Sequence, residues 1–252
     1  ALFDSARPKI LVTELFPFGR RRFRFELIPL LKAAKNEGVK IFCSVRDNVQ
    51  RRPPARETET IDWLKSYYSG VLVHGDPKFM PFSESFAKAN EIDSMIAYTG
   101  FVDTALAPVQ SGSTETIDVV ISAGGGAAGH ALYRCAAEAC ALSRHDQMRW
   151  IILAGAEPSP GVLDELRTLG GAKLTAEPNR RDFRELLRAC RVSVSQAGYN
   201  SVVDLLATGA PALVVPFSGE GGESEQQARA QRLQALGRAS VLAQDELSPE
   251  LL

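Results

Sequence analysis

Runs of branched apolar residues alternate with segments of helical spacing along most of the chain, and this alternation restricts the fold more than any other feature. Residues 9–15 and 39–45 have the composition of buried parallel strands, and residues 25–35 between them have the spacing of a helix. Parallel strands need a crossover connection, usually a helix. The sequence therefore predicts an α/β fold with parallel sheets and helices on their faces.

The pattern repeats on both sides of a segment that has the composition of a linker. Strands are predicted over 71–74, within 92–101, and over 118–123, 149–154, 172–175, 191–195 and 212–216, and helices over 61–68, up to 141, and over 161–169, 181–189, 201–208 and 225–236. The polar, arginine-rich and proline-rich residues 47–60 predict a surface loop. We therefore expect an amino-terminal domain over 1–108, a linker over 109–117 and a carboxyl-terminal domain over 118–252.

Charge and cysteine content exclude several classes of protein. The 29 Lys and Arg residues balance 30 Asp and Glu residues, so the chain lacks the broad basic field of a nucleic-acid binder. It contains no apolar run of about 18–20 residues, the length that a membrane-spanning helix needs. Its four cysteines show no ligand-like spacing, which predicts reduced thiols in a cytoplasmic protein and no metal site. The chain begins without Met and ends where a helix would be starting, so we expect both ends to be cut.

A glycine-rich turn follows the first predicted strand of the second domain. Gly124, Gly125, Gly126 and Ala127 stand between this strand and a helix, where backbone N–H groups and the helix dipole favour a diphosphate. A tight turn that binds nothing has the same composition. The turn lacks the Gly-Lys-Ser/Thr of a nucleotide-triphosphate loop and the acidic partner of a dinucleotide site.

The most specific segment is residues 193–204. A strand ends at Ser195, a turn carries Gly198, and Asn200 or Ser201 is expected to cap the next helix. Asp204 then lies about one turn inside that helix, where a carboxylate suits a ribose diol. An ordinary capped helix would also explain Ser201 and Asp204.

A third loop, residues 216–224, precedes Glu225, Gln226 and Gln227 at the start of a predicted helix. Carboxylate and amide side chains at the carboxyl end of a strand suit sugar hydroxyls, which need both donors and acceptors. The alternative is a solvated first turn whose acidic residues are favoured by the dipole.

The three segments together resemble the carboxyl-terminal signature of the MurG-like glycosyltransferases of family 28. The shared motifs are Ser-x-Ala-Gly-x-x-Ser, then Gly-Ala-Pro-Ala-Leu-Val-Val-Pro, then Glu-Gln-Gln-x-Arg-Ala, and the resemblance is strong from about 118 to 237. It implies a GT-B fold, in which two Rossmann-like parallel-sheet domains face a cleft. Nothing before residue 9 matches the family's amino-terminal glycine-rich loop, which implies that the amino-terminal domain is incomplete.

The resemblance also implies roles for residues of the second domain. Residues 124–127 take the place of the diphosphate loop, and Gly198, Tyr199, Asn200 and Ser201 that of the loop on the phosphates. Asp204 replaces the family's ribose-binding Glu and is one methylene shorter. Gln226 and Gln227 match the glutamine pair that reads the donor sugar, and residues 177–181 lie where the uracil would be held. The nucleotide sugar is a substrate, so no cofactor and no metal are implied.

Candidates for catalysis and acceptor contact are few. Glu14, at the end of the first strand, is a candidate base, and the alternative is a carboxylate paired with an arginine. His130, in the first turn after the glycine-rich loop, is a candidate phosphate contact or a surface histidine. Arg20 and Arg21 belong to a loop of aromatics and arginines. This composition suits phosphates of a lipid-linked or phosphorylated acceptor, and the alternatives are an RNA-binding patch or a solvated basic turn.

The implied function is transfer of a hexose or N-acetylhexosamine from a nucleotide sugar, with UDP as the default nucleotide, to an unknown acceptor by direct displacement. A UDP-sugar 2-epimerase and a non-catalytic nucleotide-sugar-binding subunit are the alternatives. The resemblance further implies a cytoplasmic protein that can contact the inner face of the membrane, a lipid-linked acceptor, and no nucleic-acid partner.

Overall fold

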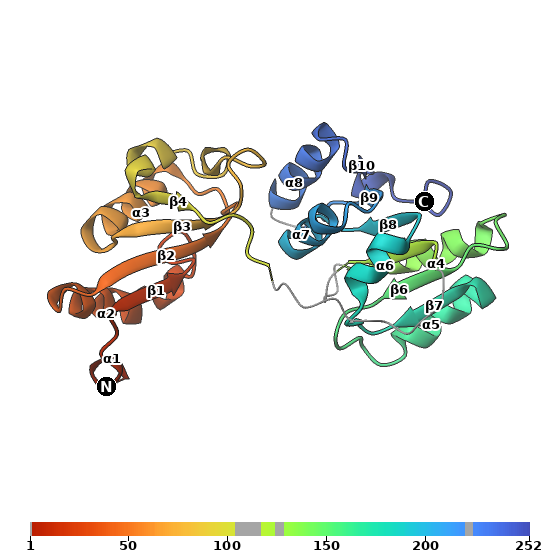
Figure 1. Ribbon diagram of the computed structural model, residues 1–252, viewed down its shortest axis with the longest axis horizontal. Helices are drawn as coiled ribbons and strands as arrows, with labels where there is room; N and C mark the ends of the chain where they lie inside the picture. Colours follow the sequence, from red (N-terminus) through yellow and green to blue (C-terminus); the bar gives the residue numbers. More distant parts are fainter. Residues whose placement is uncertain (1, 104–116, 124–128, 220–223) are drawn as a thin grey trace. The chain divides into compact units, whose positions relative to one another are not determined.

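The computed structural model describes residues 2–103, 117–123, 129–219 and 224–252 (Figure 1). The chain divides into two compact units, residues 1–103 and 104–252. Each unit is built on its own parallel sheet, so the predicted fold class is confirmed. The linker expected over 109–117 falls almost entirely outside the described residues.

The first unit has a four-stranded sheet in the order β1-β2-β3-β4, with every neighbouring pair parallel. Its strands are β1 (Ile10–Glu14), β2 (Lys40–Arg46), β3 (Gly70–His74) and β4 (Ile96–Tyr98). Its helices are α1 (Leu2–Ala6), α2 (Arg24–Asn36) and α3 (Pro54–Tyr67), with the short 3-10 helices η1 (Arg21–Phe23), η2 (Phe82–Glu84) and η3 (Ala89–Met95).

One face of this sheet is packed and the other is open in the described residues. Alternate residues of β2, among them Cys43 and Val45, belong to one buried cluster with residues of α2 and α3. Residues of the opposite register are more exposed, and Val12 of β1 has 52% of its surface accessible. A strand with one packed face follows from the alternation of side chains across the sheet.

The second unit has a six-stranded parallel sheet in the order β10-β9-β8-β5-β6-β7. Its strands are β5 (Val119–Ser122), β6 (Trp150–Leu153), β7 (Leu174–Glu177), β8 (Val192–Ser195), β9 (Ala212–Val214) and β10 (Ser240–Val241). Its helices are α4 (His130–Leu142), α5 (Val162–Gly170), α6 (Phe183–Ala189), α7 (Tyr199–Thr208) and α8 (Ser224–Ala235), with 3-10 helices η5 (Gly171–Lys173) and η6 (Gln244–Glu246).

Strand β5 lies at the centre of this sheet, between β8 and β6. Its consecutive residues Val119, Val120 and Ile121 are all buried, as expected for a parallel strand covered on both faces. The strand order reverses at β5, since the chain first adds β6 and β7 on one side and then β8, β9 and β10 on the other. Open α/β sheets bind ligands beside such a point, outside the carboxyl ends of the strands.

The structure corrects the sequence-based prediction in a few places. The loop predicted over 47–60 is wrong from Pro54 onward, because α3 begins there with proline at its first position, where no backbone donor is needed. The polar composition of this segment indicated a loop, but Glu57 and Thr60 are polar residues that are buried within this helix. The short elements α1 and β10 were not predicted at all. No helix in the described part of the chain is long and apolar enough to cross a membrane.

Candidate functional site

The loops that leave β5, β8 and β9 at their carboxyl ends carry the three motifs of the second unit. Gly124, Gly125, Gly126 and Ala127 lie outside the described residues, so their prediction stays untested. The hydroxyl of Tyr133 accepts a hydrogen bond from Ala123 N (3.1 Å) and donates one to Leu153 O (3.1 Å). This residue of α4 therefore joins the carboxyl ends of β5 and β6.

Helix α7 begins without a capping side chain. Its N-cap residue is Gly198, and among the residues that the structure describes no side-chain hydrogen bond caps the helix. The expectation that Asn200 or Ser201 caps α7 is therefore wrong: both lie within its first turn, because the helix begins two residues earlier than predicted. The first N–H groups of a helix have no partner within the helix, and a helix N-terminus without a side-chain cap suits an anion.

The space beside Gly198 is open. Its φ of −62° is ordinary for any residue, and among the described residues a Cβ added there would meet nothing closer than Ser201 Oγ at 3.9 Å. Neither the backbone nor the packing therefore requires glycine at this position. A close approach of a ligand to the backbone is the other physical reason for a glycine.

Ser195, the last residue of β8, has an unusual hydroxyl. The residue is 3% exposed, and its Oγ is buried without a hydrogen-bond partner within the described ranges. Such groups are rare in folded proteins because they lose their water without gaining a partner. No residue pattern in the sequence predicts this feature.

Asp204 lies in the middle of α7 and contacts α6. Its Oδ1 accepts a hydrogen bond of 2.8 Å from Nε of Arg184, and both side chains are about one-fifth exposed. A ribose would have to share this carboxylate with Arg184. Sequence analysis missed Arg184, since its partner lies 20 residues away on another helix.

Gln226 ties the start of α8 to two neighbouring loops. Its Oε1 accepts hydrogen bonds from Ala197 N (3.1 Å), just after β8, and from Phe217 N (3.0 Å), after β9. The neighbouring Gln227 is exposed. The two glutamines are therefore not equivalent: one supports the loops, and the other presents its amide to solvent.

Arg229 is a buried cation close to these loops. Its side chain is 3% exposed, its guanidinium lies 5.9 Å from the ring centroid of Tyr199, and it contacts Glu225 at 3.5 Å. Helices α7 and α8 are thus linked by an arginine that sequence analysis did not single out. The spacing of Glu225 and Arg229, four residues apart on one helix face, was the available signal.

The segment expected to hold the uracil, residues 177–181, begins at the last residue of β7. Its backbone is joined to the end of β6, because Ala154 N donates to Glu177 O (2.9 Å) and Asn179 N donates to Gly155 O (2.9 Å). Arg180 forms two hydrogen bonds with Asp182, at 2.9 and 2.6 Å, and this contact lowers the pKa of the Asp182 carboxyl.

The two weak catalytic candidates both have charged partners. Nε2 of His130 lies 3.6 Å from Oε2 of Glu165 on α5, and its side chain is 41% exposed. Glu14 is 72% exposed, and one of its oxygens lies 2.8 Å from Arg20. The structure thus favours, for Glu14, the alternative of a carboxylate paired with an arginine.

The structure gives Arg21 a different role from the expected contact with an acceptor phosphate. Its guanidinium contacts Glu59 and Thr60 of α3 and lies 4.6 Å from the ring centroid of Trp63. In the same loop, Phe16 and Phe18 are buried in the core of the first unit. The loop of aromatics and arginines is therefore anchored to the protein by most of its large side chains.

This anchored loop has unusual backbone geometry. The peptide bond between Phe16 and Pro17 is cis, and the non-glycine residues Leu15 and Arg20 have φ values of 66° and 51°. Gly19 is packed so closely that an added Cβ would lie 2.8 Å from Cδ2 of Leu15. Positive φ values at non-glycine residues such as Leu15 and Arg20 persist where surrounding contacts impose them.

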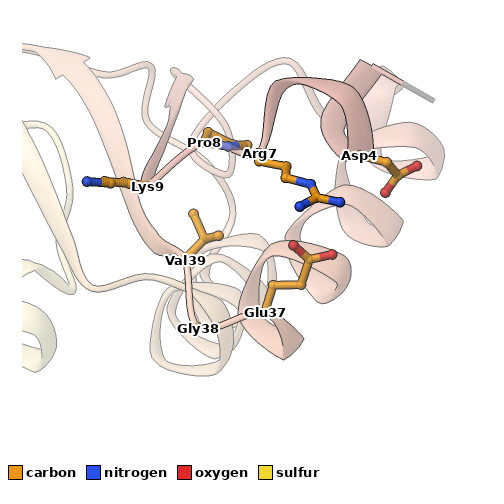
Figure 2. Close-up of a pocket in the computed structure, with 7 residues that line it drawn as sticks. All are labelled: Asp4, Arg7, Pro8, Lys9, Glu37, Gly38 and Val39. Atoms are coloured by element: carbon orange, nitrogen blue, oxygen red, sulfur yellow. The ribbon is translucent and has the colours of Figure 1, made fainter.

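A cavity of about 500 Å³ lies at the opposite edge of the first sheet, at the amino ends of β1 and β2 (Figure 2). Its lining includes Asp4, Arg7, Lys9 and Glu37. Ligands of parallel α/β sheets bind at the carboxyl ends, so this cavity is not a candidate for the site. No group of three or more His, Cys, Asp or Glu residues in the described ranges is placed to hold a metal ion.

Comparison with known proteins supports the resemblance read from the motifs. A curated relative, the UDP-N-acetylglucosamine–N-acetylmuramyl-(pentapeptide) pyrophosphoryl-undecaprenol N-acetylglucosamine transferase of Agrobacterium fabrum, is 30% identical over 149 residues, which are 58% of this chain and 38% of that protein. The chain matches only about a fifth to two fifths of the length of such curated relatives, from 21% to 38%.

Solved structures with the same fold include the MurG of Acinetobacter baumannii. The TM-score is 0.62 at 17% identity, and the match covers 99% of this chain and 65% of that one. A UDP-N-acetylglucosamine 2-epimerase, described as putative, from Listeria monocytogenes has a TM-score of 0.60 at 14% identity, covering 99% and 65% of the two chains. These similarities show a GT-B fold. About a third of each neighbour's chain has no counterpart in this chain.

The family itself is shown by the second unit. The profile of the glycosyltransferase family 28 C-terminal domain matches residues 117–252, which are more than half of the chain. These residues include all six strands β5 to β10 and the three motif-bearing loops. The chain therefore belongs to glycosyltransferase family 28.

Proposed function

We propose that this chain is part of a glycosyltransferase that moves a hexose or N-acetylhexosamine from a UDP-linked donor to an acceptor hydroxyl. Family membership and the name of the Agrobacterium relative support this class of reaction. The donor would bind at the carboxyl edge of the second sheet, with its diphosphate at the start of α7. One observation carries the proposal: among the described residues, the N-terminus of α7 has no side-chain cap, and there is free space beside its N-cap residue Gly198.

The first turn of α7 would provide the positive charge that a leaving diphosphate needs. A helix N-terminus carries the equivalent of about half a positive charge, and fixed dipoles stabilise charge that develops in a transition state. Arg229, buried beside Tyr199 at the same end of α7 and paired with Glu225, places two further donor-bearing nitrogens of its guanidinium near this point. Direct displacement without a metal ion is consistent with this source of charge.

Other residues near the carboxyl ends of the strands of the second sheet would hold the nucleoside and the sugar. Asp204 would accept a hydrogen bond from the ribose, Gln227 would read the sugar hydroxyls, and Gln226 would hold the two loops that enclose them. Residues 124–127 and the segment 177–181 keep the phosphate and uracil roles that the family resemblance implies. Arg20, exposed at the end of its loop, remains a proposed contact for an acceptor phosphate.

The acceptor is proposed to be lipid-linked, as the printed name of the Agrobacterium relative says of that enzyme's acceptor. A protein acting on such an acceptor would work in the cytoplasm at the inner face of the membrane. Co-sedimentation of the chain with vesicles that contain an anionic lipid tests this proposal. Retention of the protein in the supernatant at low ionic strength would contradict it.

A 2-epimerase is the second candidate, because a structure of that name shares the fold. Incubation with labelled UDP-sugars separates the candidates. Release of UDP supports the transferase, since water can replace the acceptor. A changed sugar still attached to UDP supports the epimerase, and binding without any turnover supports a non-catalytic subunit.

A further inference from the structure

Two serines of β8 are buried, and they differ in whether the described residues supply a hydrogen-bond partner. Ser193 is 1% exposed, and its Oγ donates to Pro211 O at 3.4 Å. Ser195 is 3% exposed, and its Oγ has no partner among the described residues. Because side chains alternate across a strand, both serines lie on the same face of the sheet. The difference between them is therefore a matter of position along the strand.

Ser195 stands at the point where the strand order of the second sheet reverses. It is the last residue of β8 and the register partner of Ser122, the last residue of β5. The chain leaves these neighbouring strands in opposite directions across the sheet, from β5 through α4 to β6 and from β8 through α7 to β9. Open α/β sheets bind their ligands beside strands whose connections diverge in this way.

The side chain of Ser195 lies on the face of the sheet that α7 covers. Val194, its neighbour in β8, belongs to one buried cluster with Leu132 of α4 and Leu166 of α5. Crossovers between parallel strands are right-handed, so α6 and α7, which lead back across the sheet, cover the opposite face. Ser195 therefore shares a face with α7, and it stands just before Gly198, the N-cap residue of that helix.

A phosphate group fits both the hydroxyl and the helix start. In the described part of the chain, no side chain caps α7, so its first N–H groups are available to an acceptor. The hydroxyl of Ser195 can donate one proton as well. A ligand hydroxyl would satisfy Ser195, but the positive end of the helix dipole favours an anion. The two features together therefore favour a phosphate oxygen.

We propose that the Ser195 hydroxyl donates a hydrogen bond to a phosphate oxygen of the nucleoside diphosphate that binds at the start of α7, an inference that rests on the function proposed above. In the ligand-free protein this hydroxyl lowers stability, because it has lost its water without gaining a partner. The bound phosphate supplies the partner. The same group therefore weakens the free protein and strengthens the complex, and every residue involved belongs to the second unit.

Ser195→Ala should have opposite effects on stability and on UDP affinity. In the ligand-free full chain, its melting temperature should equal or exceed that of the wild type, because the substitution removes a buried polar atom that has no partner. Its dissociation constant for UDP should rise about tenfold or more, the loss expected for a hydrogen bond to a charged group. Thermal denaturation and isothermal calorimetry measure the two effects.

Ser193→Ala is the matched control. It removes the same atom from the same face of the same strand, but it breaks the hydrogen bond with Pro211 O. Its melting temperature should therefore fall, and its UDP affinity should equal that of the wild type. A loss of UDP affinity in Ser193→Ala as large as in Ser195→Ala would show an effect of the strand rather than of the Ser195 hydroxyl, and would overturn the inference.

Titration with uridine separates the phosphates from the nucleoside. Uridine has no phosphate, so Ser195→Ala and the wild type should bind it equally, and the preference for UDP over uridine should shrink in the variant. An equal loss of affinity for UDP and uridine would place the hydroxyl against the nucleoside and overturn the inference.

Failure of this inference and failure of the proposed function give different results. Unchanged UDP affinity in Ser195→Ala overturns the inference and leaves the proposed donor site in place. A fall in both melting temperature and UDP affinity also overturns it, since the hydroxyl then has a structural partner such as an ordered water. Absence of UDP binding by the wild type contradicts the proposed function and the inference together.

Discussion

Nε of Arg184 donates a hydrogen bond of 2.8 Å to Oδ1 of Asp204 and so joins α6 to α7. The carboxylate that family 28 membership would assign to the ribose is therefore already ordered by a neighbouring cation. Order of this kind lowers the entropy that ligand binding must remove. The pair is about one-fifth exposed, so it is screened less than a surface ion pair.

Asp204→Ala should weaken UDP binding by about 1–3 kcal/mol, because a charge-assisted hydrogen bond to the ribose is lost. Isothermal calorimetry with UDP measures the change. Asp164→Ala is the matched control, since Asp164 also pairs with an arginine, Arg167, but on α5 and with 82% of its side chain exposed. Equal affinity in the wild type and a folded Asp204→Ala variant would remove Asp204 from the site.

Gln226→Ala should affect stability, whereas Gln227→Ala should affect affinity for the sugar. Loss of the Gln226 carbonyl leaves two backbone N–H groups without their acceptor, so we expect the free energy of unfolding to fall by about 1–3 kcal/mol. Gln227→Ala should keep stability and UDP affinity and reduce affinity for the cognate UDP-sugar. Urea denaturation and titration with a panel of UDP-sugars measure both effects. Equal loss of UDP and UDP-sugar affinity in Gln227→Ala would show that this residue does not read the sugar.

Gly198→Ala should preserve the fold and weaken UDP binding, because the new methyl group would occupy space that the phosphates need. A methyl group that intrudes on a packed contact costs about 1–3 kcal/mol. Gly209→Ala is the control at the other end of α7. Its φ of 69° makes Ala unfavourable, so that variant should lose about 1–2 kcal/mol of stability and keep its UDP affinity. Full UDP affinity in Gly198→Ala would argue against phosphate binding at this end of α7.

The stability of the first unit should fall at alkaline pH. Burial raises the pKa of the Cys43 thiol and of the Tyr68 hydroxyl above their usual values of 9.0 and 10.0. When the pKa of a group is higher in the folded state, unfolding releases protons once the pH exceeds the pKa of that group in the unfolded chain. The free energy of unfolding should therefore decrease above about pH 9, by up to about 1.4 kcal/mol per pH unit for each group.

Urea denaturation at pH 8, 9, 10 and 11 measures this decrease. Cys43→Ala should remove the part that begins near pH 9, and Tyr68→Phe the part that begins near pH 10. The second substitution also removes the hydrogen bond from the Tyr68 hydroxyl to Phe16 O, 3.0 Å, which should lower stability at pH 8 as well. An identical pH slope in Cys43→Ala and the wild type would show that Cys43 ionises as easily in the folded state.

The regular elements of the fold were predictable because parallel strands are short continuous apolar runs. Strand β8, predicted over 191–195, was found at Val192–Ser195. The prediction failed where tertiary contacts override local composition. Helix α3 begins within a polar, proline-rich segment whose composition is typical of a loop. Its residue Glu57 is nevertheless buried against the rest of the unit, a contact that local composition does not indicate. Strand β10 has only two residues, too few for any period to show.

The candidate site was predictable to the level of its loops but not of its side-chain partners. The motifs located Gly198, Asp204 and Gln226 at the carboxyl edge of the second sheet. The partners of these residues come from other elements, as Arg184 does for Asp204, and no spacing rule joins them.

The central claim is that the second unit binds a UDP-linked donor at the start of α7, and titration of the full chain with UDP tests it most directly. The account predicts saturable binding of one UDP per chain, weakened in both Gly198→Ala and Asp204→Ala and unchanged in Asp164→Ala. ADP in the same titration should bind more weakly, since the base site is expected to hold uracil. Absence of UDP binding at millimolar concentration, or equal binding by the wild type and both site variants, would contradict the account.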